Sequence, residues 1–246
     1  MTKLLRRFLA WNRRLSEGLV DKFAVFSRDA DYRSELVDRI HSDIRIQKLH
    51  SILEVGGIDR PLLEKSANYA FDGLDIEHRE NCEVVYDNFR VQSIEDPVDA
   101  KYDMVISITL LEHVPDNSSA IDSIAGCLVK GGRTHHYIPS KWHPYSIALR
   151  IIGPKWQTRL IPLLRPGTET VTGYPAFFDH CSAPAMKKLF SEKGFSNIHI
   201  RAFYNANDYF AWFLPAFLLV ALFERICAKL NLQIFASGFI ISAEKV

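Results

Sequence analysis

Residues 51–61 read SILEVGGIDRP, an apolar run that carries one glutamate and leads into two glycines. The apolar residues predict a short buried strand, and the glycines predict a tight turn after it. Pro61 suits the first turn of a helix, so we expect a helix over residues 60–68. A strand, a glycine turn and a helix in this order are typical of an open α/β sheet.

The chain repeats this alternation between residues 50 and 138. Further strands are expected at 69–76, 82–87, 102–108 and 133–139, with a helix at 117–132 that begins at Asn117 or Ser118 and closes on Gly131. After an irregular segment the pattern resumes, with a helix at 182–195 and strands at 197–204 and 233–246. The alternation predicts an α/β fold with a mostly parallel sheet, helices on both faces and an antiparallel last strand.

The composition suits one folded domain. The chain has 246 residues, of which 48% are hydrophobic, and a net charge of +1. This near balance argues against a nucleic-acid partner, which usually requires a basic excess. The four cysteines are widely spaced, which argues against a disulfide framework or a zinc ribbon and favours a reducing, cytoplasmic setting. Arginines interrupt the first twenty residues, so we do not expect a signal peptide.

We expect a single domain over residues 1–246 with three additions. They are an amino-terminal helical extension at 1–48, a lid insertion at 139–180 and an apolar helical insertion at 206–232. The lid segment is rich in prolines and aromatic residues. Long insertions of this kind often cover a binding site.

The glycine turn does not match a dinucleotide-binding fingerprint. Such a site needs G-x-G-x-x-G, and Ile58, Asp59 and Arg60 follow Gly57 here. A nicotinamide oxidoreductase is therefore disfavoured. Asp75 lies about twenty residues after the first glycine, at the end of the next expected strand, where a carboxylate can accept hydrogen bonds from both hydroxyls of a ribose. The alternative for Asp75 is a solvated aspartate at a strand end.

Five motifs in order resemble those of class I S-adenosylmethionine-dependent methyltransferases. They are LEVGG (53–57), GLDIE (73–77), YDMVISITLLEHV (102–114), LVKGGRTHHYIP (128–139) and SEKGF (191–195). The third is similar to the YDxVxSxxxLEHV motif of a subgroup called methyltransferase type 11. The resemblance implies a Rossmann-like, doubly wound, seven-stranded sheet and S-adenosyl-L-methionine as the cofactor. This cofactor has no pyrophosphate, so a shortened glycine pattern is tolerable.

The resemblance also implies a cofactor site. Glu54 would orient the turn and contact the amino-acid end of the cofactor, and Gly56 and Gly57 would let the backbone pass close to the ribose. Asp75 would hold the ribose hydroxyls. Ser107, just past the fourth strand of the family, would face the methionine portion through its backbone carbonyl. The expected residues around the adenine are Gln92, Ser93 and Ile94.

An oxygen acceptor usually needs a general base, whereas a carbon or nitrogen acceptor can do without one. The candidate catalytic bases are His143, ranked first, and His180. The alternative for each is a lid histidine that holds loop backbone, and we expect a structural role for His113. No metal ion is expected, although residues 179–181 (DHC) contain ligand types for one.

Two apolar segments raise the question of membrane contact. Residues 209–223 are shorter than the roughly twenty residues that a spanning helix needs, and Pro215 interrupts them. In residues 1–20, apolar positions can share one helical face beside four arginines, as in helices that lie in anionic interfaces. We expect peripheral contact with the inner face of an anionic membrane. The alternatives are a core helix for the first segment and a helix that closes the cofactor cleft for the second.

These observations favour an enzyme that methylates a small or lipid-linked acceptor, such as a hydroxyl of a glycan precursor or of a quinone-like molecule. The aromatic lid residues and the apolar insertion point to such an acceptor. The alternative is a non-catalytic scaffold with a methyltransferase fold that binds a membrane surface or a protein partner. The incomplete glycine pattern and the lack of an obvious base favour that alternative.

Overall fold

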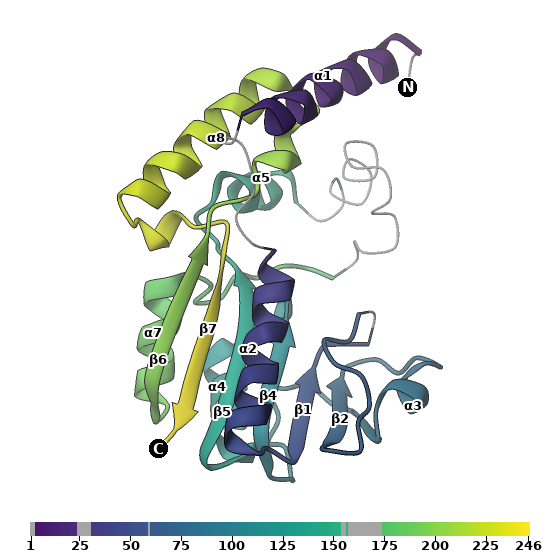
Figure 1. Cartoon of the computed structure of the whole chain (residues 1–246), viewed down its shortest axis with the longest axis vertical. Coiled ribbons are helices and arrows are strands. Elements are labelled where there is room, and N and C mark those ends of the chain that lie inside the picture. The colour runs from purple at the N-terminus through teal and green to yellow at the C-terminus, as the bar shows by residue number, and fades with distance from the viewer. Residues whose placement is uncertain (1–2, 24–30, 59, 154–155, 157–173) are drawn as a thin grey trace. The chain divides into compact units, whose positions relative to one another are not determined.

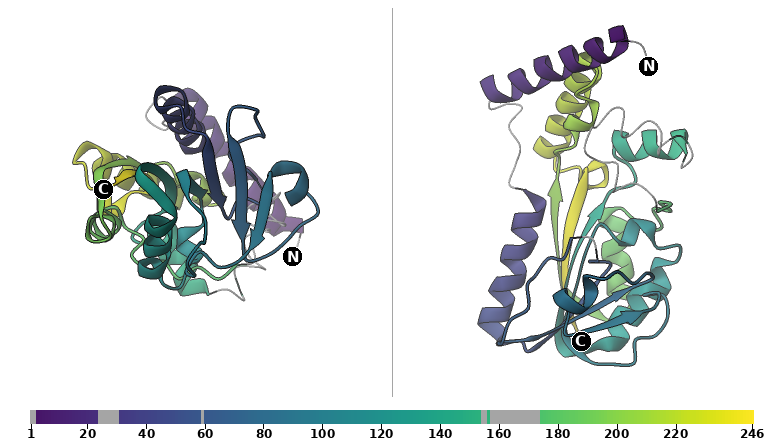
Figure 2. Two further views of the ribbon diagram at one scale, coloured as in Figure 1. Left: turned by 90° about the horizontal axis from the view of Figure 1, so that it is seen from below. Right: turned by 90° about the vertical axis from the view of Figure 1, so that its right-hand side faces the viewer.

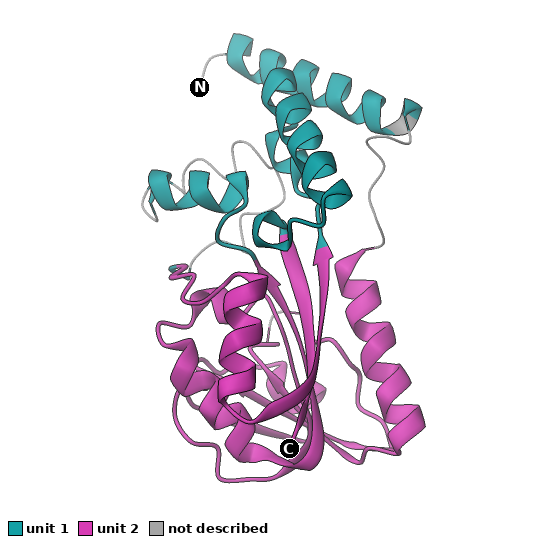
Figure 3. Ribbon diagram, turned by 90° about the vertical axis from the view of Figure 1, so that its left-hand side faces the viewer, with its two compact units in different colours: residues 1–29, 140–175, 203–237 teal, residues 30–139, 176–202, 238–246 magenta. Residues whose placement is uncertain are grey.

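The computed structural model describes residues 3–23, 31–58, 60–153, 156 and 174–246. They form two compact units, each assembled from separate pieces of the chain (Figure 3). Unit 1 comprises residues 1–29, 140–175 and 203–237, and unit 2 comprises residues 30–139, 176–202 and 238–246. Asp59 and much of the expected lid, namely residues 154–155 and 157–173, lie outside the described part of the chain.

A seven-stranded sheet forms the centre of unit 2 (Figure 1). Its strands are β1 (Ser51–Val55), β2 (Ala70–Asp75), β3 (Asn88–Val91), β4 (Tyr102–Ile108), β5 (Leu128–Pro139), β6 (Phe195–Phe203) and β7 (Gly238–Lys245). The order across the sheet is β3-β2-β1-β4-β5-β7-β6, so the chain winds outward in both directions from β1 and β4. Strands β1 to β5 pair in parallel, and β7 pairs antiparallel with β5. The expected Rossmann-like fold, with its antiparallel last strand, is confirmed.

Helices cover both faces of this sheet (Figure 2). The helical elements of unit 2 are α2 (Tyr32–Gln47), α3 (Cys82–Val85), the 3-10 turn η2 (Leu111–His113), α4 (Asn117–Cys127) and α7 (Ala183–Glu192). On the α2 face, His135 Nε2 of β5 lies 3.1 Å from Asp43 Oδ2. On the other face, the ring of His136 packs against Phe190 of α7. The two histidines lie on opposite faces because successive residues of a strand alternate.

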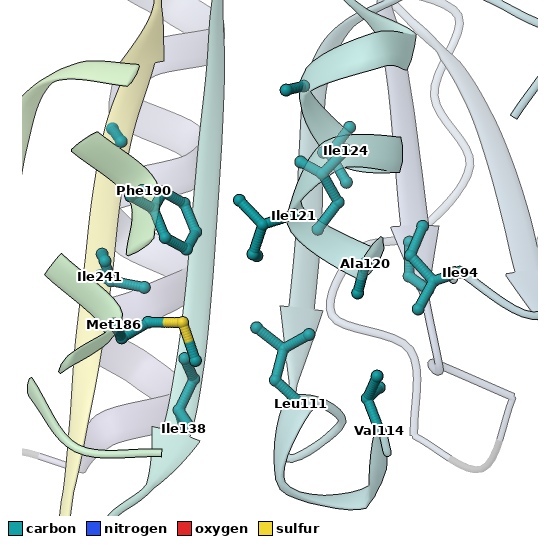
Figure 4. Packing of buried hydrophobic residues seen from close by; sticks show 14 of the residues in the cluster. Ile94, Leu111, Val114, Ala120, Ile121, Ile124, Ile138, Met186, Phe190 and Ile241 are labelled. Atoms are coloured by element: carbon teal, nitrogen blue, oxygen red, sulfur yellow. The ribbon is translucent and has the colours of Figure 1, made fainter. Parts of the chain in front are cut away.

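A large apolar cluster lies between the sheet and helices α4 and α7 (Figure 4). Helix α4 contributes Ile121 and Ile124, and α7 contributes Met186 and Phe190, each at most 1% exposed. Burying side chains of this size stabilises a fold by about 1.5–3 kcal/mol each. Leu111 from the segment after β4 belongs to the same cluster, so this packing also anchors the loop at the carboxyl end of β4.

The helix expected at residues 60–68 does not form, and that prediction was wrong. The described residues between β1 and β2 make turns and bends instead. Leu62 donates its N–H to the Glu54 carboxyl group at 2.8 Å, and the Arg33 guanidinium donates to the Pro61 carbonyl at 2.6 Å. In a helix the Pro61 carbonyl would accept a backbone N–H from four residues further on, whereas here it is bonded to Arg33, and the two side chains hold the segment in an irregular path.

The strand expected at residues 82–87 was also wrong. Residues Cys82–Val85 form the single helical turn α3, and the edge strand β3 follows it. Apolar and β-branched residues favour a strand here, but Cys82 and Tyr86 are both buried, which is the spacing of one helical turn.

The helix expected at residues 117–132 forms but ends earlier, at Cys127. Leu128 instead joins the sheet opposite Tyr102. The N-cap is Asp116 rather than Asn117 or Ser118, because the Asp116 carboxylate accepts the N–H of Ser118 at 2.9 Å. The carboxylate also satisfies the N–H of Ser119, as capping aspartates commonly do.

Unit 1 is helical. Its elements are α1 (Lys3–Lys22), α5 (Pro144–Ile152), the 3-10 turn η3 (Asn207–Phe210), α8 (Leu214–Lys229) and the 3-10 turn η4 (Gln233–Phe235). Helix α1 contacts the start of α8, where Asn12 Oδ1 accepts the N–H of Leu214 at 3.0 Å. No helix in the described ranges combines the length and apolar character needed to cross a bilayer.

Candidate functional site

Glu54 lies near the carboxyl end of β1, and its side chain is fully buried. Its Oε1 accepts the N–H of Leu62 at 2.8 Å, and its Oε2 accepts the hydroxyl of Tyr86 at 3.0 Å. Burial raises the pKa of Glu54 to about 7, against the lowering effect of these two hydrogen bonds. Glu54 thus ties the turn after β1 to the segment before β3. Its contact with the amino-acid end of a cofactor stays a prediction.

The two glycines of the turn are required by their neighbours. Gly56 has a φ of +76°, and a Cβ added there would lie 2.7 Å from Leu110 Cδ1. A Cβ added to Gly57 would overlap the carboxyl group of Glu54 and lie 2.5 Å from the Tyr86 hydroxyl oxygen. Because neither position has room for a side chain, the turn presents bare backbone beside the loop that follows β4.

Asp75 ends β2, the strand adjacent to β1. The residue is half-buried, and its Oδ1 accepts the N–H of Glu77 at 3.2 Å. Its position is close to the glycine turn, because the N–H of Gly56 donates to the carbonyl of Leu74 at 2.9 Å. A carboxylate at this position is of the type that accepts hydrogen bonds from the hydroxyls of a ribose.

The three residues expected around the adenine lie on the loop after β3. The N–H of Gln92 donates to the carbonyl of Asp75 at 2.9 Å, and its side-chain amide donates to the carbonyls of Asp96 and Pro97. Ser93 bonds within the same loop, and Ile94 packs in the apolar core at 4% exposure. The loop is therefore held beside Asp75 by internal bonds, and its contact with an adenine stays a prediction.

Ser107 lies inside β4 rather than past its end, and its side chain is fully buried. The Ser107 hydroxyl is 2.7 Å from Nδ1 of His136, and the Thr134 hydroxyl is bonded to the other ring nitrogen, Nε2. Burial lowers the pKa of His136 to about 3, so the imidazole is neutral. This cluster was not predicted from the sequence, although the alternation along β5 places Thr134 and His136 on one face.

Glu112 of the LEHV motif is a second buried carboxyl group that the sequence analysis missed. It is 4% exposed, and burial raises its pKa to about 8. Its backbone carbonyl accepts the N–H of Phe177 at 2.8 Å and that of Phe178 at 3.0 Å. These bonds hold the segment that contains His180 against the loop after β4, the same loop that borders the glycine turn through Leu110.

The first candidate base, His143, is fully buried in unit 1. Its Nε2 lies 3.1 Å from Glu224 Oε1, and its Nδ1 accepts the N–H of Tyr145, which caps α5. Glu224 Oε1 also accepts the N–H of Ala206. Both ring nitrogens of His143 are engaged within the protein, which favours a structural role over catalysis.

His180, the second candidate base, is more accessible. Its side chain is 47% exposed, and its Nδ1 lies 2.8 Å from Asp179 Oδ1. Asp179 is itself fixed, because its Oδ2 accepts the N–H of Asn117 at the start of α4. With the proton on Nδ1, the basic atom of this imidazole is Nε2. An accessible imidazole oriented by a fixed carboxylate has the arrangement of a general base.

Over the part of the chain that the structure describes, no three histidine, cysteine or acidic side chains are arranged to hold a metal ion. In the DHC segment, the Cys181 thiol is buried and lies 3.2 Å from the carbonyl oxygen of Asp179.

Comparison with known protein families shows which family the chain belongs to. The model of a family described as a methyltransferase domain matches residues 3–200. The chain belongs to this methyltransferase family. This match confirms the expected methyltransferase membership, and the cofactor expected with it is S-adenosyl-L-methionine.

The curated relatives of this methyltransferase include ubiquinone biosynthesis O-methyltransferases. The protein of Bordetella parapertussis is 33% identical over 110 residues, which are 44% of this chain and 43% of the relative. The protein of Alkalilimnicola ehrlichii is 29% identical over 130 residues, which are 51% of this chain and 50% of the relative. The chain therefore matches half or less of the length of each of these relatives.

Solved structures share the fold of this methyltransferase. A SAM-dependent methyltransferase from Archaeoglobus fulgidus has a TM-score of 0.50 and 15% identity, covering 87% of this chain and 94% of its own. The N-methyltransferase NodS from Bradyrhizobium japonicum WM9, in complex with S-adenosyl-L-homocysteine, has a TM-score of 0.51 and 11% identity, covering 88% of this chain and 89% of its own. At these identities the likeness shows the fold.

The residues at the carboxyl ends of β1 and β2 fit this cofactor. The described residues after the glycine turn form no helix, so they offer no helix N-terminus to a phosphate. S-Adenosyl-L-methionine carries no phosphate and does not need one. The bare backbone of Gly56 and Gly57 and the adjacent Asp75 carboxylate are instead suited to a ribose.

Proposed function

We propose that this protein transfers the methyl group of S-adenosyl-L-methionine to a hydroxyl of a small, quinone-like acceptor. The observation that carries the proposal is the half-buried Asp75 carboxylate beside a glycine turn that has no room for side chains. The family match supports methyl transfer, and the names of the curated relatives support an oxygen acceptor of this kind. The proposal includes a lipid-linked form of the acceptor, because unit 1 exposes many apolar side chains.

In the proposed reaction the protein chiefly binds and aligns. Asp75 would accept hydrogen bonds from the two ribose hydroxyls, and Glu54 would keep the glycine turn in place through the N–H of Leu62. The bound cofactor supplies a methyl group on a sulfonium, whose leaving thioether is neutral. The protein must therefore hold the acceptor oxygen about 3 Å from the methyl carbon and exclude water.

His180 is the proposed general base. Its Nε2 would take the proton of the acceptor hydroxyl while Asp179 holds the proton on Nδ1. The acceptor oxygen then forms a bond to the methyl carbon as the carbon–sulfur bond breaks. The proton on His180 passes to solvent, which the 47% exposed side chain can reach.

Isothermal titration with S-adenosyl-L-homocysteine tests the cofactor site. Asp75→Asn should weaken binding at least tenfold, because two charge-assisted hydrogen bonds to the ribose lose their charge. Glu77→Gln, two residues further on at an exposed position, is the matched control and should bind as the unaltered chain does. Absence of binding heat at ligand concentrations well above micromolar would count against the site.

Methyl-labelled cofactor then tests the acceptor class. The labelled methyl group should appear on a hydroxylated quinone-like ring, and not on glycan precursors assayed in parallel. His180→Gln should lower kcat by about 10²-fold while leaving the affinity for S-adenosyl-L-homocysteine unchanged. Cofactor binding without transfer to any acceptor would instead favour the non-catalytic scaffold.

A further inference from the structure

Helix α1 turns polar side chains toward its own unit and apolar side chains toward solvent. Asn12 is 3% exposed and Ser16 is fully buried, and both bond the segment that leads into α8. Four apolar residues recur along this helix at positions i, i+4, i+7 and i+11, namely Leu4, Phe8, Trp11 and Leu15. Their exposed fractions lie between 37% and 78%. This spacing places them in one stripe along the helix. We call these four residues the α1 stripe.

Basic side chains border the α1 stripe. Arg7 and Arg14 are exposed and lie four residues before and three residues after Trp11, so they flank it on the helix surface. The first acidic residue in the chain is Glu17, so the charged residues that precede it are all basic. A tryptophan placed between an apolar stripe and a basic border is typical of a helix that lies in a bilayer interface.

Helix α8 belongs to the same unit (Figure 3). Its exposed apolar residues add a second apolar surface to that unit. Its buried side includes Phe217 and Glu224. Its exposed side carries four large apolar residues, each between 38% and 69% exposed: Leu218, Leu219, Leu222 and Ile226. No charged residue occurs between Asp208 and Glu224, so nothing polar interrupts the first turns of this exposed side.

We propose that the α1 stripe and the exposed side of α8 bind the surface of an anionic lipid bilayer. A bilayer offers what both surfaces need, namely an apolar layer that a helix enters to a depth of about 5–10 Å and negatively charged headgroups for the flanking arginines. A second copy of the chain suits the surface less well, because a two-fold interface along α1 would bring its basic borders together. The proposal does not depend on methyl transfer.

Flotation of the full chain with vesicles tests the proposal. The protein should float with vesicles of phosphatidylcholine and phosphatidylglycerol, should float poorly with phosphatidylcholine alone, and should be released by high salt. Phe8→Asp combined with Leu15→Asp should lower the affinity for the anionic vesicles by roughly tenfold or more. Arg7→Glu combined with Arg14→Glu should do the same.

Matched controls come from unit 2. Val84→Asp changes an apolar residue that is 76% exposed, and Lys187→Glu combined with Lys188→Glu reverses two exposed charges on α7. Both controls should float as the unaltered chain does, and circular dichroism should show that every variant is folded. Protein that stays at the bottom of the gradient, or an equal loss in the controls, overturns the proposal. A dimer in light scattering without lipid that Phe8→Asp with Leu15→Asp dissociates would assign the surface to a second copy instead.

Discussion

The crossover from β1 to β2 and the crossover from β4 to β5 start from similar sequence signals and become different structures. Each carries apolar residues and a residue suited to a helix start. The second forms α4, whose first N–H groups are capped by Asp116. The first has no helix in its described residues, and the N–H of Leu62 bonds to Glu54 of the preceding strand.

The difference shows which interaction decides the path of the chain. In α4 the capping group is local, and the apolar spacing of Ile121 and Ile124 matches the core that the helix covers. After β1, the buried Glu54 carboxyl group accepts the N–H of Leu62, and the Arg33 guanidinium donates to the carbonyls of residues 60 and 61. The irregular crossover is also the one that borders the proposed cofactor site. The chain therefore has no helix in its described residues at the place where the backbone must contact a ligand.

The same substitution in the two crossovers should have opposite effects. Gly57→Ala should destabilise the protein by roughly 3 kcal/mol or more, because the added methyl group would overlap the Glu54 carboxyl group and the Tyr86 hydroxyl. Urea unfolding measures the effect.

Gly126→Ala is the control for this prediction. Gly126 lies in α4 with nothing within 4 Å of an added Cβ, so the change should stabilise the protein by about 0.5–1 kcal/mol. A mild effect of Gly57→Ala, similar in size to that of Gly126→Ala, would show that the turn after β1 is looser than its contacts indicate.

The buried carboxyl group of the first crossover should make stability depend on pH. Burial raises the pKa of Glu54 from 4.5 to about 7, so in that range the folded protein binds more protons than the unfolded chain. The free energy of unfolding should therefore fall as pH rises from about 4.5 to about 7, with a contribution from Glu54 on the order of 2–3 kcal/mol. Glu54→Gln should remove that contribution.

Urea unfolding at several pH values checks this prediction, and Glu64→Gln provides the control. Glu64 is exposed in the same crossover, so its substitution should leave the dependence of the free energy of unfolding on pH unchanged. Burial also raises the pKa of Glu112, to about 8. Glu112 therefore accounts for any dependence of stability on pH that persists in the Glu54→Gln variant. If the free energy of unfolding changed with pH equally in the unaltered chain and in Glu54→Gln, Glu54 would be charged in the folded protein.

Removing the cap of the second crossover should have the smallest effect. Asp116→Ala leaves the N–H groups of Ser118 and Ser119 without their carboxylate acceptor and should lower the thermal midpoint by about 2–4 °C. Ser118→Ala keeps the backbone N–H and should leave the midpoint unchanged. A larger loss for Ser118→Ala than for Asp116→Ala would contradict the assignment of the cap.

Several elements could be predicted because their signals are local. The strand at 102–108 matches β4, since a continuous apolar run suits a strand buried on both faces. The helix before Gly194 also formed as expected, and Gly194 adopts a φ of +80° that favours glycine. The strand at 82–87 was misjudged because β-branched residues there outweighed the wider spacing of Cys82 and Tyr86.

The candidate site divides in the same way. The glycine turn and Asp75 could be predicted, because each follows a recognisable strand and carries a residue type suited to a ribose. The partners of these residues come from distant positions and left no local signal: Tyr86 on Glu54, Leu110 against Gly56, and Asp179 beside His180 in a motif first considered for metal binding.

The sequence by itself determined the α/β class of the fold, most of its strands, the family of the chain and the residue types at the carboxyl ends of β1 and β2, because periodicity, turn residues and motif spacing are written along the chain. Only the tertiary structure decided which carboxyl groups are buried with a raised pKa, which histidine is accessible, and which crossover forms no helix in its described residues. Those properties depend on burial and on hydrogen bonds between residues far apart in sequence, and no local pattern encodes them.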